Sequence, residues 1–242
     1  MFPIRDALPT RNLPLVVKAL VAVNVVVFLL TWEDLDRAAR AYGAVAWHYT
    51  GQAAHGLRLP DGTYLAPVAD DGRTILRTLA HMFVHGSLMH ILGNMWFLWV
   101  FGDNVEDRLG RVRFVVFYVL CGLAALAAQV ISDPASGLPM VGASGAIGGV
   151  MGAYLRLHPG TPILTFVPLG FYPLFFTLPA AAFLLYWLVI QALMGVTGLL
   201  GPSAGGGVAF WAHVGGFVAG FLLVGPMAPR PRTRARIEVK WD

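Results

Sequence analysis

The chain of 242 residues contains little cysteine and little charge. Its one cysteine, Cys121, excludes a disulfide within the chain, and the apolar neighbours of this residue favour a buried, inert thiol. Charged residues make up 12% of the sequence, whereas soluble domains contain about 25%. Hydrophobic residues make up 57%, and the mean hydropathy is +0.67. This composition excludes an ordinary soluble domain and predicts an integral membrane protein.

Signals of several other protein classes are also absent. There is no internal repeat and no pair of opposite charges within the apolar runs, as many transporters have. The first apolar run begins near residue 14; it is too long for the core of a secretory signal and lacks a convincing cleavage site, so we expect a retained span. The net charge of +4 is weak evidence for nucleic acid, and we predict no such partner.

Long apolar runs predict an all-α membrane protein with six transmembrane helices. The predicted spans cover residues 15–32, 88–101, 114–131, 144–155, 179–194 and 208–224. The apolar stretch 163–196 is too long for one upright span, and Pro168, Pro173 and Pro179 interrupt it. We therefore expect its first half to lie along the membrane interface or to bend through it. The predicted division is a cytoplasmic segment 1–13, a six-helix membrane domain 14–226 and a basic cytoplasmic tail 227–242.

Basic residues near the span ends predict the orientation in the bilayer. Twelve lysines and arginines gather on one side of the predicted spans, and the other five lie in the long loop after the first span. Cytoplasmic loops of membrane proteins carry the excess of positive charge. Both termini are therefore predicted to be cytoplasmic in a multi-pass protein of the bacterial inner membrane.

Polar side chains within membrane spans are costly and usually functional, and four of those in the predicted spans lie near helix ends. His90 and Asn94 are four residues apart, on one face of the second helix. Ser144 opens the fourth helix, and His213 lies about five residues into the sixth. With the N-terminus inside, all four lie near the outer ends of their helices, on the order of 10 Å deep at the rise of an α-helix. They are therefore expected to meet at one depth.

Ser144, Gly148 and Gly152 fall on one face of the fourth helix, and His213, Gly216 and Gly220 fall on one face of the sixth. Such stripes let two helix backbones approach closely, which serves packing and also brings the hydroxyl within reach of the imidazole. A neutral imidazole can accept the proton of a serine nucleophile. No acidic residue lies in the predicted spans, so we predict a Ser–His dyad. Asn24 and Gln191 are predicted to form interhelical hydrogen bonds.

These residues resemble the motifs of the rhomboid intramembrane serine proteases. The matching segments are Gly142-Ala143-Ser144-Gly145, the set His85, His90 and Asn94, Ala212-His213 with Gly216 and Gly220, and Glu106-Asp107-Arg108-Leu109-Gly110. The resemblance implies a nucleophile at Ser144, a base at His213 and an oxyanion hole formed by His90, Asn94 and the Ser144 N–H. It makes His85, Gly142, Gly145, Gly216 and Gly220 structural neighbours of the site, with His85 as a hydrogen-bonding neighbour.

The resemblance further implies cleavage of single-span membrane proteins near the outer face, at a small residue, without metal or cofactor. Two positions depart from the family pattern. Leu76-Arg77 replaces a common Trp-Arg pair, and Gly148 replaces an aromatic residue that often packs under the histidine. An aromatic side chain of the fifth or sixth helix is expected to steady His213 instead.

Two alternatives to the serine protease follow from the same residues. One is a catalytically silent rhomboid-like protein that only binds membrane proteins; such relatives typically lack the serine or the histidine, which this chain keeps. The other is a zinc-dependent membrane protease that uses His81, His85 and His90. The sequence contains no His-Glu-x-x-His motif, which disfavours this alternative.

Overall fold

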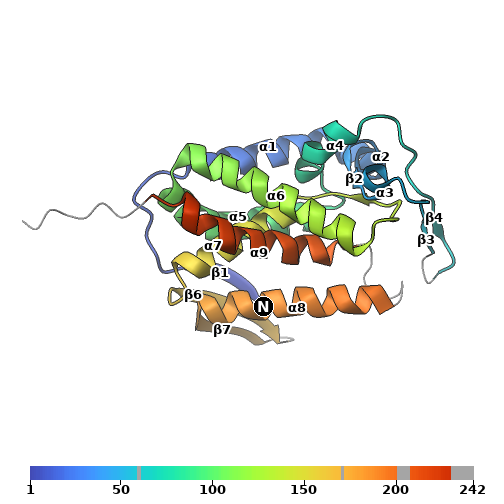
Figure 1. Ribbon diagram of the computed structural model, residues 1–242. Coiled ribbons are helices and arrows are strands. Elements are labelled where there is room, and N and C mark those ends of the chain that lie inside the picture. Colours follow the sequence, from blue (N-terminus) through green and yellow to red (C-terminus); the bar gives the residue numbers. More distant parts are fainter. Residues whose placement is uncertain (59–60, 170–171, 201–207, 230–242) are drawn as a thin grey trace, which may run out of the picture.

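The computed structural model describes residues 1–58, 61–169, 172–200 and 208–229. In this part the chain is mostly helical, as predicted (Figure 1). The helices are α1 Leu15–Thr31, α2 Leu35–Tyr42, α3 Trp47–Thr50, α4 Thr74–Ala80, α5 Leu88–Leu109, α6 Arg111–Ser132, α7 Ser144–Leu157, α8 Ala180–Leu200 and α9 Phe210–Met227, with short 3-10 turns η1 Trp32–Asp34 and η2 His81–Phe83. Residues 230–242 of the predicted tail lie outside the described residues.

Each of the six predicted spans is a helix, but α5 is two turns longer than the sequence suggested. Glu106, near its end, is buried and accepts hydrogen bonds from the backbone N–H groups of Val16 and Val17, at 3.1 and 2.8 Å. A carboxylate there satisfies donors that the first turn of α1 would leave unpaired. The expectation that the second helix ends at residue 101, before any acidic residue, is therefore wrong.

Four helices in the described residues have the length and apolarity of a membrane span. They are α1 with its continuation to Tyr42, α6, α8 as far as Gly198, and α9. Of the other two predicted spans, α5 carries several charges in its last two turns, and α7 has only 14 residues, most of them buried. These helices make the chain an integral membrane protein.

The fold is not all-α, because three small sheets accompany the helices. The proline-containing stretch before α8 forms an antiparallel hairpin of β6 Pro162–Leu169 and β7 Tyr172–Pro179, joined by β1 Phe2–Asp6 in the order β1-β6-β7. Prolines at both ends of this hairpin prevent a helix, and β-branched and aromatic residues between them favour strands. The two-stranded sheets pair β2 Ala44–Val45 with β5 Pro139–Met140, and β3 Leu57–Arg58 with β4 Tyr64–Leu65.

Helices α7 and α9 pack backbone against backbone in the middle of the bundle (Figure 1). A Cβ atom at Gly216 would overlap the carbonyl oxygen of Gly145, and one at Gly220 would overlap that of Gly149. Glycine is therefore required at both positions of α9. The close approach brings the first turn of α7 against the start of α9, where Ser144 and His213 lie.

Replacing Gly220 by valine is expected to lower the free energy of unfolding by about 2–3 kcal/mol, because the side chain would have to displace the α7 backbone. Thermal unfolding in detergent measures the change. The matched control is Gly198→Val in α8, where an added Cβ meets no atom within 4 Å. Equal midpoints for the two variants would contradict the packing described here.

Candidate functional site

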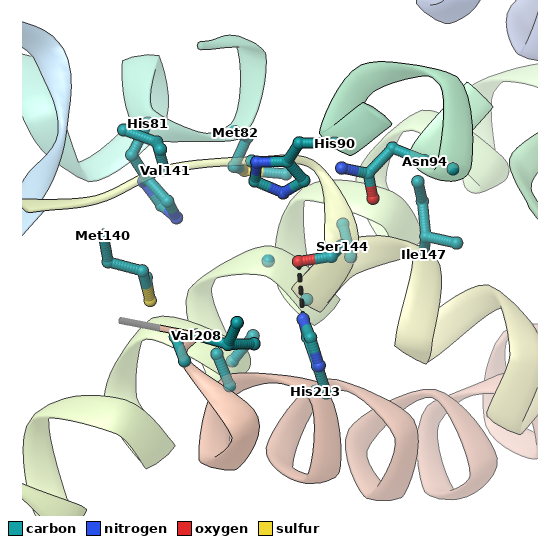
Figure 2. A pocket seen from close by; sticks show the side chains of 18 of the residues that line it. His81, Met82, His90, Asn94, Met140, Val141, Ser144, Ile147, Val208 and His213 are labelled. Atoms are coloured by element: carbon teal, nitrogen blue, oxygen red, sulfur yellow. Dashed lines mark hydrogen bonds between the residues drawn. The ribbon is translucent and has the colours of Figure 1, made fainter. Parts of the chain in front are cut away.

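The first residue of α7 and the imidazole of α9 are hydrogen-bonded to each other. The Ser144 hydroxyl oxygen lies 2.7 Å from Nε2 of His213 (Figure 2). Ser144 is placed by a turn in which Gly142 has a φ of 116° and donates its N–H to the carbonyl of His81. This φ is in a region that favours glycine, so the turn before the serine depends on this residue.

Helices α8 and α9 supply further contacts of the His213 ring. The side-chain oxygen of Gln191 lies 2.7 Å from Nδ1, so the interhelical hydrogen bond predicted for Gln191 ends on the histidine itself. Trp187 packs beside the ring with a centroid distance of 5.8 Å, and Phe210 of α9 approaches it edge-on at 6.3 Å. Aromatic residues of the fifth and sixth helices thus hold the ring, while Gly148 contributes no side chain.

His90 and Asn94 face Ser144 from the first two turns of α5 (Figure 2). The Ser87 hydroxyl caps this helix by accepting from the His90 N–H at 3.1 Å. Nε2 of His90 lies so close to Gly142 that a Cβ there would be 2.6 Å away. The amide nitrogen of Asn94 is buried and has no hydrogen-bond partner among the described residues. Side-chain groups capable of donating therefore face the hydroxyl from the side opposite His213.

His85 lies in the loop before α5 and is fully buried. Its ring packs against His90 with a centroid distance of 5.1 Å and an interplanar angle of 72°. Neither ring nitrogen forms a hydrogen bond within the described residues, so the contact is one of packing, not the predicted hydrogen bond. Burial, and secondarily the neighbouring His90, lowers the pKa of His85 to about 4, which keeps the ring neutral at physiological pH.

Ser144 and His213 line one cavity of about 640 Å³. Its polar lining includes Ser144, His213, His90, Asn94 and Gln191, and much of the rest is apolar, including Met82, Met89, Met140, Val141 and Val208. Such a cavity can take an extended apolar segment while presenting a few polar groups to its backbone.

The histidines considered for zinc binding do not gather into a metal site. In the ranges described, no three His, Cys, Asp or Glu side chains lie close enough together to hold a metal ion. Nδ1 of His81 donates to the carbonyl of Arg77 at 3.0 Å, and the His85 ring packs on His90. The cluster His81, His85 and His90 predicted for the zinc alternative therefore does not form as a ligand set.

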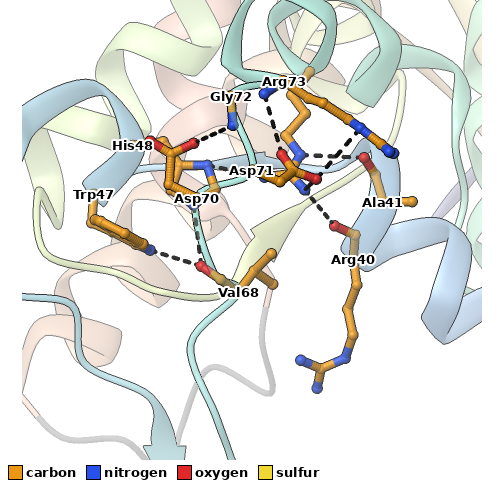
Figure 3. A network of polar contacts seen from close by, with 10 residues as sticks. Arg40, Ala41, Trp47, His48, Val68, Asp70, Asp71, Gly72 and Arg73 are labelled. Carbon is orange, nitrogen blue, oxygen red and sulfur yellow. Dashed lines mark hydrogen bonds and ion pairs between the residues drawn. The ribbon is translucent and has the colours of Figure 1, made fainter.

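A polar network orders the long loop beside the cavity (Figure 3). The Arg77 side chain is 2% exposed and donates to Asp71 at 3.2 Å, to the carbonyls of Arg40 and Ala41, and to Nδ1 of His48. Nε2 of His48 donates to Val68 O in turn. Arg77 lies in α4, and this helix leads directly into His81 and Met82 of the cavity wall. The network therefore anchors the segment from which this part of the wall continues.

The fold and the site together define the class of this protein. It is a helical membrane bundle in which a serine hydroxyl contacts an imidazole. The chain matches the Rhomboid domain family over residues 72–230, which is more than half of its length. The protein therefore belongs to the rhomboid family, and the resemblance found in its motifs is confirmed.

Several curated relatives carry rhomboid names. The rhomboid protease GlpG of Salmonella paratyphi A is 28% identical over 161 residues, 66% of this chain and 51% of that protein. RHOMBOID-like protein 5 of Arabidopsis thaliana is 33% identical over 79 residues, 33% of this chain and 26% of that protein. The mitochondrial presenilin-associated rhomboid-like protein of Homo sapiens is 33% identical over 94 residues, 38% and 25% of the two chains. The chain thus spans about half the length of these relatives or less.

Replacing Arg77 by methionine is expected to lower the free energy of unfolding by about 2–3 kcal/mol, because buried carbonyls lose a charged donor. Arg77→Lys should recover little of this, since one ammonium cannot reproduce the guanidinium fork. Thermal unfolding in detergent measures both. The control is Arg73→Met, whose side chain is 56% exposed and should change stability little. An Arg77→Met protein as stable as this control would contradict the supporting role.

Proposed function

We propose that this protein is an intramembrane serine endopeptidase with Ser144 as nucleophile and His213 as general base. The observation that carries the proposal is the 2.7 Å contact between the Ser144 hydroxyl and His213 Nε2 in the wall of a cavity within a membrane bundle. A serine hydroxyl attacks a peptide carbonyl only when a base accepts its proton, and this contact supplies the base.

The reaction follows from the groups around the serine. As the Ser144 oxygen bonds to the scissile carbonyl carbon, its proton passes to Nε2 of His213, and the carbonyl oxygen becomes an oxyanion. Asn94, His90 and the Ser144 backbone N–H, at the start of α7, are the donors proposed to stabilise it. When the oxyanion collapses, the carbon–nitrogen bond of the substrate breaks and His213 passes the proton to the leaving amine, which leaves Ser144 acylated. Water then attacks the acyl carbon as His213 accepts a proton from it. The ester bond to Ser144 breaks, His213 gives the proton to the serine oxygen, and the new carboxyl terminus leaves.

The substrates proposed are single-span membrane proteins, cut at a small residue near the outer face of the bilayer. Six crossings with both termini in the cytoplasm of a bacterial inner membrane place Ser144 at that depth, and the positive-inside distribution supports this orientation. The name of the GlpG relative supports the protease activity. A silent membrane-protein binder is the second candidate. Such a binder typically lacks the serine or the histidine, and this chain has both.

The proposal predicts cleavage of a model transmembrane substrate by the purified protein in detergent or proteoliposomes. Ser144→Ala and His213→Ala should each abolish measurable cleavage, because each removes a partner of the proton transfer. A chelator should leave the wild-type rate unchanged.

Two outcomes decide against the proposal. Cleavage that survives in Ser144→Ala but stops with the chelator indicates a metal-dependent mechanism. Binding of the substrate without cleavage, equally in wild type and Ser144→Ala, indicates the silent binder.

Replacing Asn94 by alanine is expected to lower kcat by about 10²–10³-fold, as removal of one oxyanion donor does in serine proteases. KM should change little, because the donor acts on charge that develops only in the transition state. The control is Asn24→Ala in α1, whose amide donates to the Leu20 carbonyl of its own helix at 2.8 Å. Equal kcat values for the two variants would remove Asn94 from the oxyanion hole.

A further inference from the structure

We infer that Gln191 is a positioning residue for the reaction, because its amide oxygen holds the proton of His213 on Nδ1 and leaves Nε2 free to accept the proton of Ser144. The inference rests on the proposed function and deepens it. It replaces the predicted dyad by a line of three side chains, Ser144, His213 and Gln191, from three helices.

The three side chains are connected by two consecutive hydrogen bonds. Gln191 Oε1 lies 2.7 Å from Nδ1 of His213, and Nε2 of the same ring lies 2.7 Å from the Ser144 hydroxyl. Trp187, one turn before Gln191 on α8, packs beside the ring with an interplanar angle of 36°. One face of α8 therefore fixes both the plane of the imidazole ring and the orientation of the ring within that plane.

The chemistry of the amide then determines the tautomer. A carbonyl oxygen can only accept, so a hydrogen bond to Gln191 Oε1 requires a proton on Nδ1 of His213. A neutral imidazole with its proton on Nδ1 has a lone pair on Nε2. That lone pair points at the Ser144 hydroxyl, which must then donate. The opposite tautomer would direct an N–H at the serine and could not accept its proton.

The surrounding structure leaves this role to α8. A Cβ at Gly148 would be 2.9 Å from the His213 carbonyl oxygen, so α7 has no room for a larger residue there. Among the described residues, no carboxylate is hydrogen-bonded to the His213 ring. A neutral acceptor also avoids the cost of burying a second charge in the bundle. When His213 becomes imidazolium during attack, the Gln191 oxygen still accepts from Nδ1 and stabilises the charged ring.

Replacing Gln191 by methionine tests the inference, because the side chain keeps its length and loses the acceptor. We expect kcat for a model transmembrane substrate to fall by about 10–100-fold, the loss that misplacement of a reacting group causes. KM and the thermal midpoint should stay close to wild type. Gln191→Glu restores an acceptor oxygen and should keep kcat within about tenfold of wild type.

The matched control is Gln129→Met, the same substitution at an amide of α6 that is not among the cavity residues. It should leave kcat unchanged. Gln191→Asn, which withdraws the oxygen by one methylene, should also lower kcat and keeps the comparison available if the methionine variant unfolds.

A spectroscopic measurement reads the tautomer without any activity. In ¹⁵N-histidine NMR spectra of the purified protein, the His213 signals are assigned by their loss in His213→Ala. Wild type should show a protonated Nδ1 and an unprotonated Nε2, and Gln191→Met should show a mixture of both forms. An unchanged tautomer together with an unchanged kcat in Gln191→Met would overturn the inference. Failure of the proposed function is distinct, because wild type and Ser144→Ala would then be equally inactive whatever the spectra show.

Discussion

The close approach of α7 and α9 is the contact on which the rest of the site depends. Gly216 and Gly220 of α9 lie directly against the carbonyl groups of α7, where no larger residue fits. In a bilayer, where lipid offers no hydrophobic drive for helices to associate, small residues allow the dispersion contacts that hold two helices together. The same packing sets the separation of Ser144 from His213, so stability and geometry of the site have one origin.

Around this pair, two neighbouring helices add further groups. The start of α5 brings His90 and Asn94 to the side of Ser144 opposite the imidazole, and α8 brings Gln191 and Trp187 against the imidazole itself. Polar side chains in a membrane bundle are costly unless they are paired, and Ser144, His213 and Gln191 are hydrogen-bonded in a row. The buried amide nitrogen of Asn94 lacks such a partner among the described residues, which fits a donor used only when charge develops nearby.

Much of the fold could be predicted because apolar length and glycine spacing are local signals. A helix lies at each predicted apolar run, and the facing of Ser144 and His213 follows from glycines at four-residue intervals. The end of α5 was missed because hydropathy stops at acidic residues, whereas Glu106 is stabilised by the distant start of α1. The hairpin of β6 and β7 was missed because an apolar run alone does not separate strand from helix.

The part of the site that the sequence could not predict is the partner of Gln191. An amide in a membrane helix indicates a hydrogen bond, but its spacing within α8 does not say which helix receives it. The sequence predicts that an aromatic side chain of the fifth or sixth helix steadies His213. For the same reason, it does not identify this residue as Trp187. Both assignments depend on how α8 and α9 are rotated against each other, which only tertiary packing determines.

Covalent labelling measures whether His213 makes Ser144 a nucleophile. A fluorophosphonate reacts with a serine only where a base activates the hydroxyl. The purified protein would be treated with the probe, digested and mapped by mass spectrometry, beside His213→Ala. We expect one adduct, on Ser144, in wild type and none in His213→Ala. An adduct on Ser144 of equal yield in both proteins, or none in wild type, would contradict this role of His213.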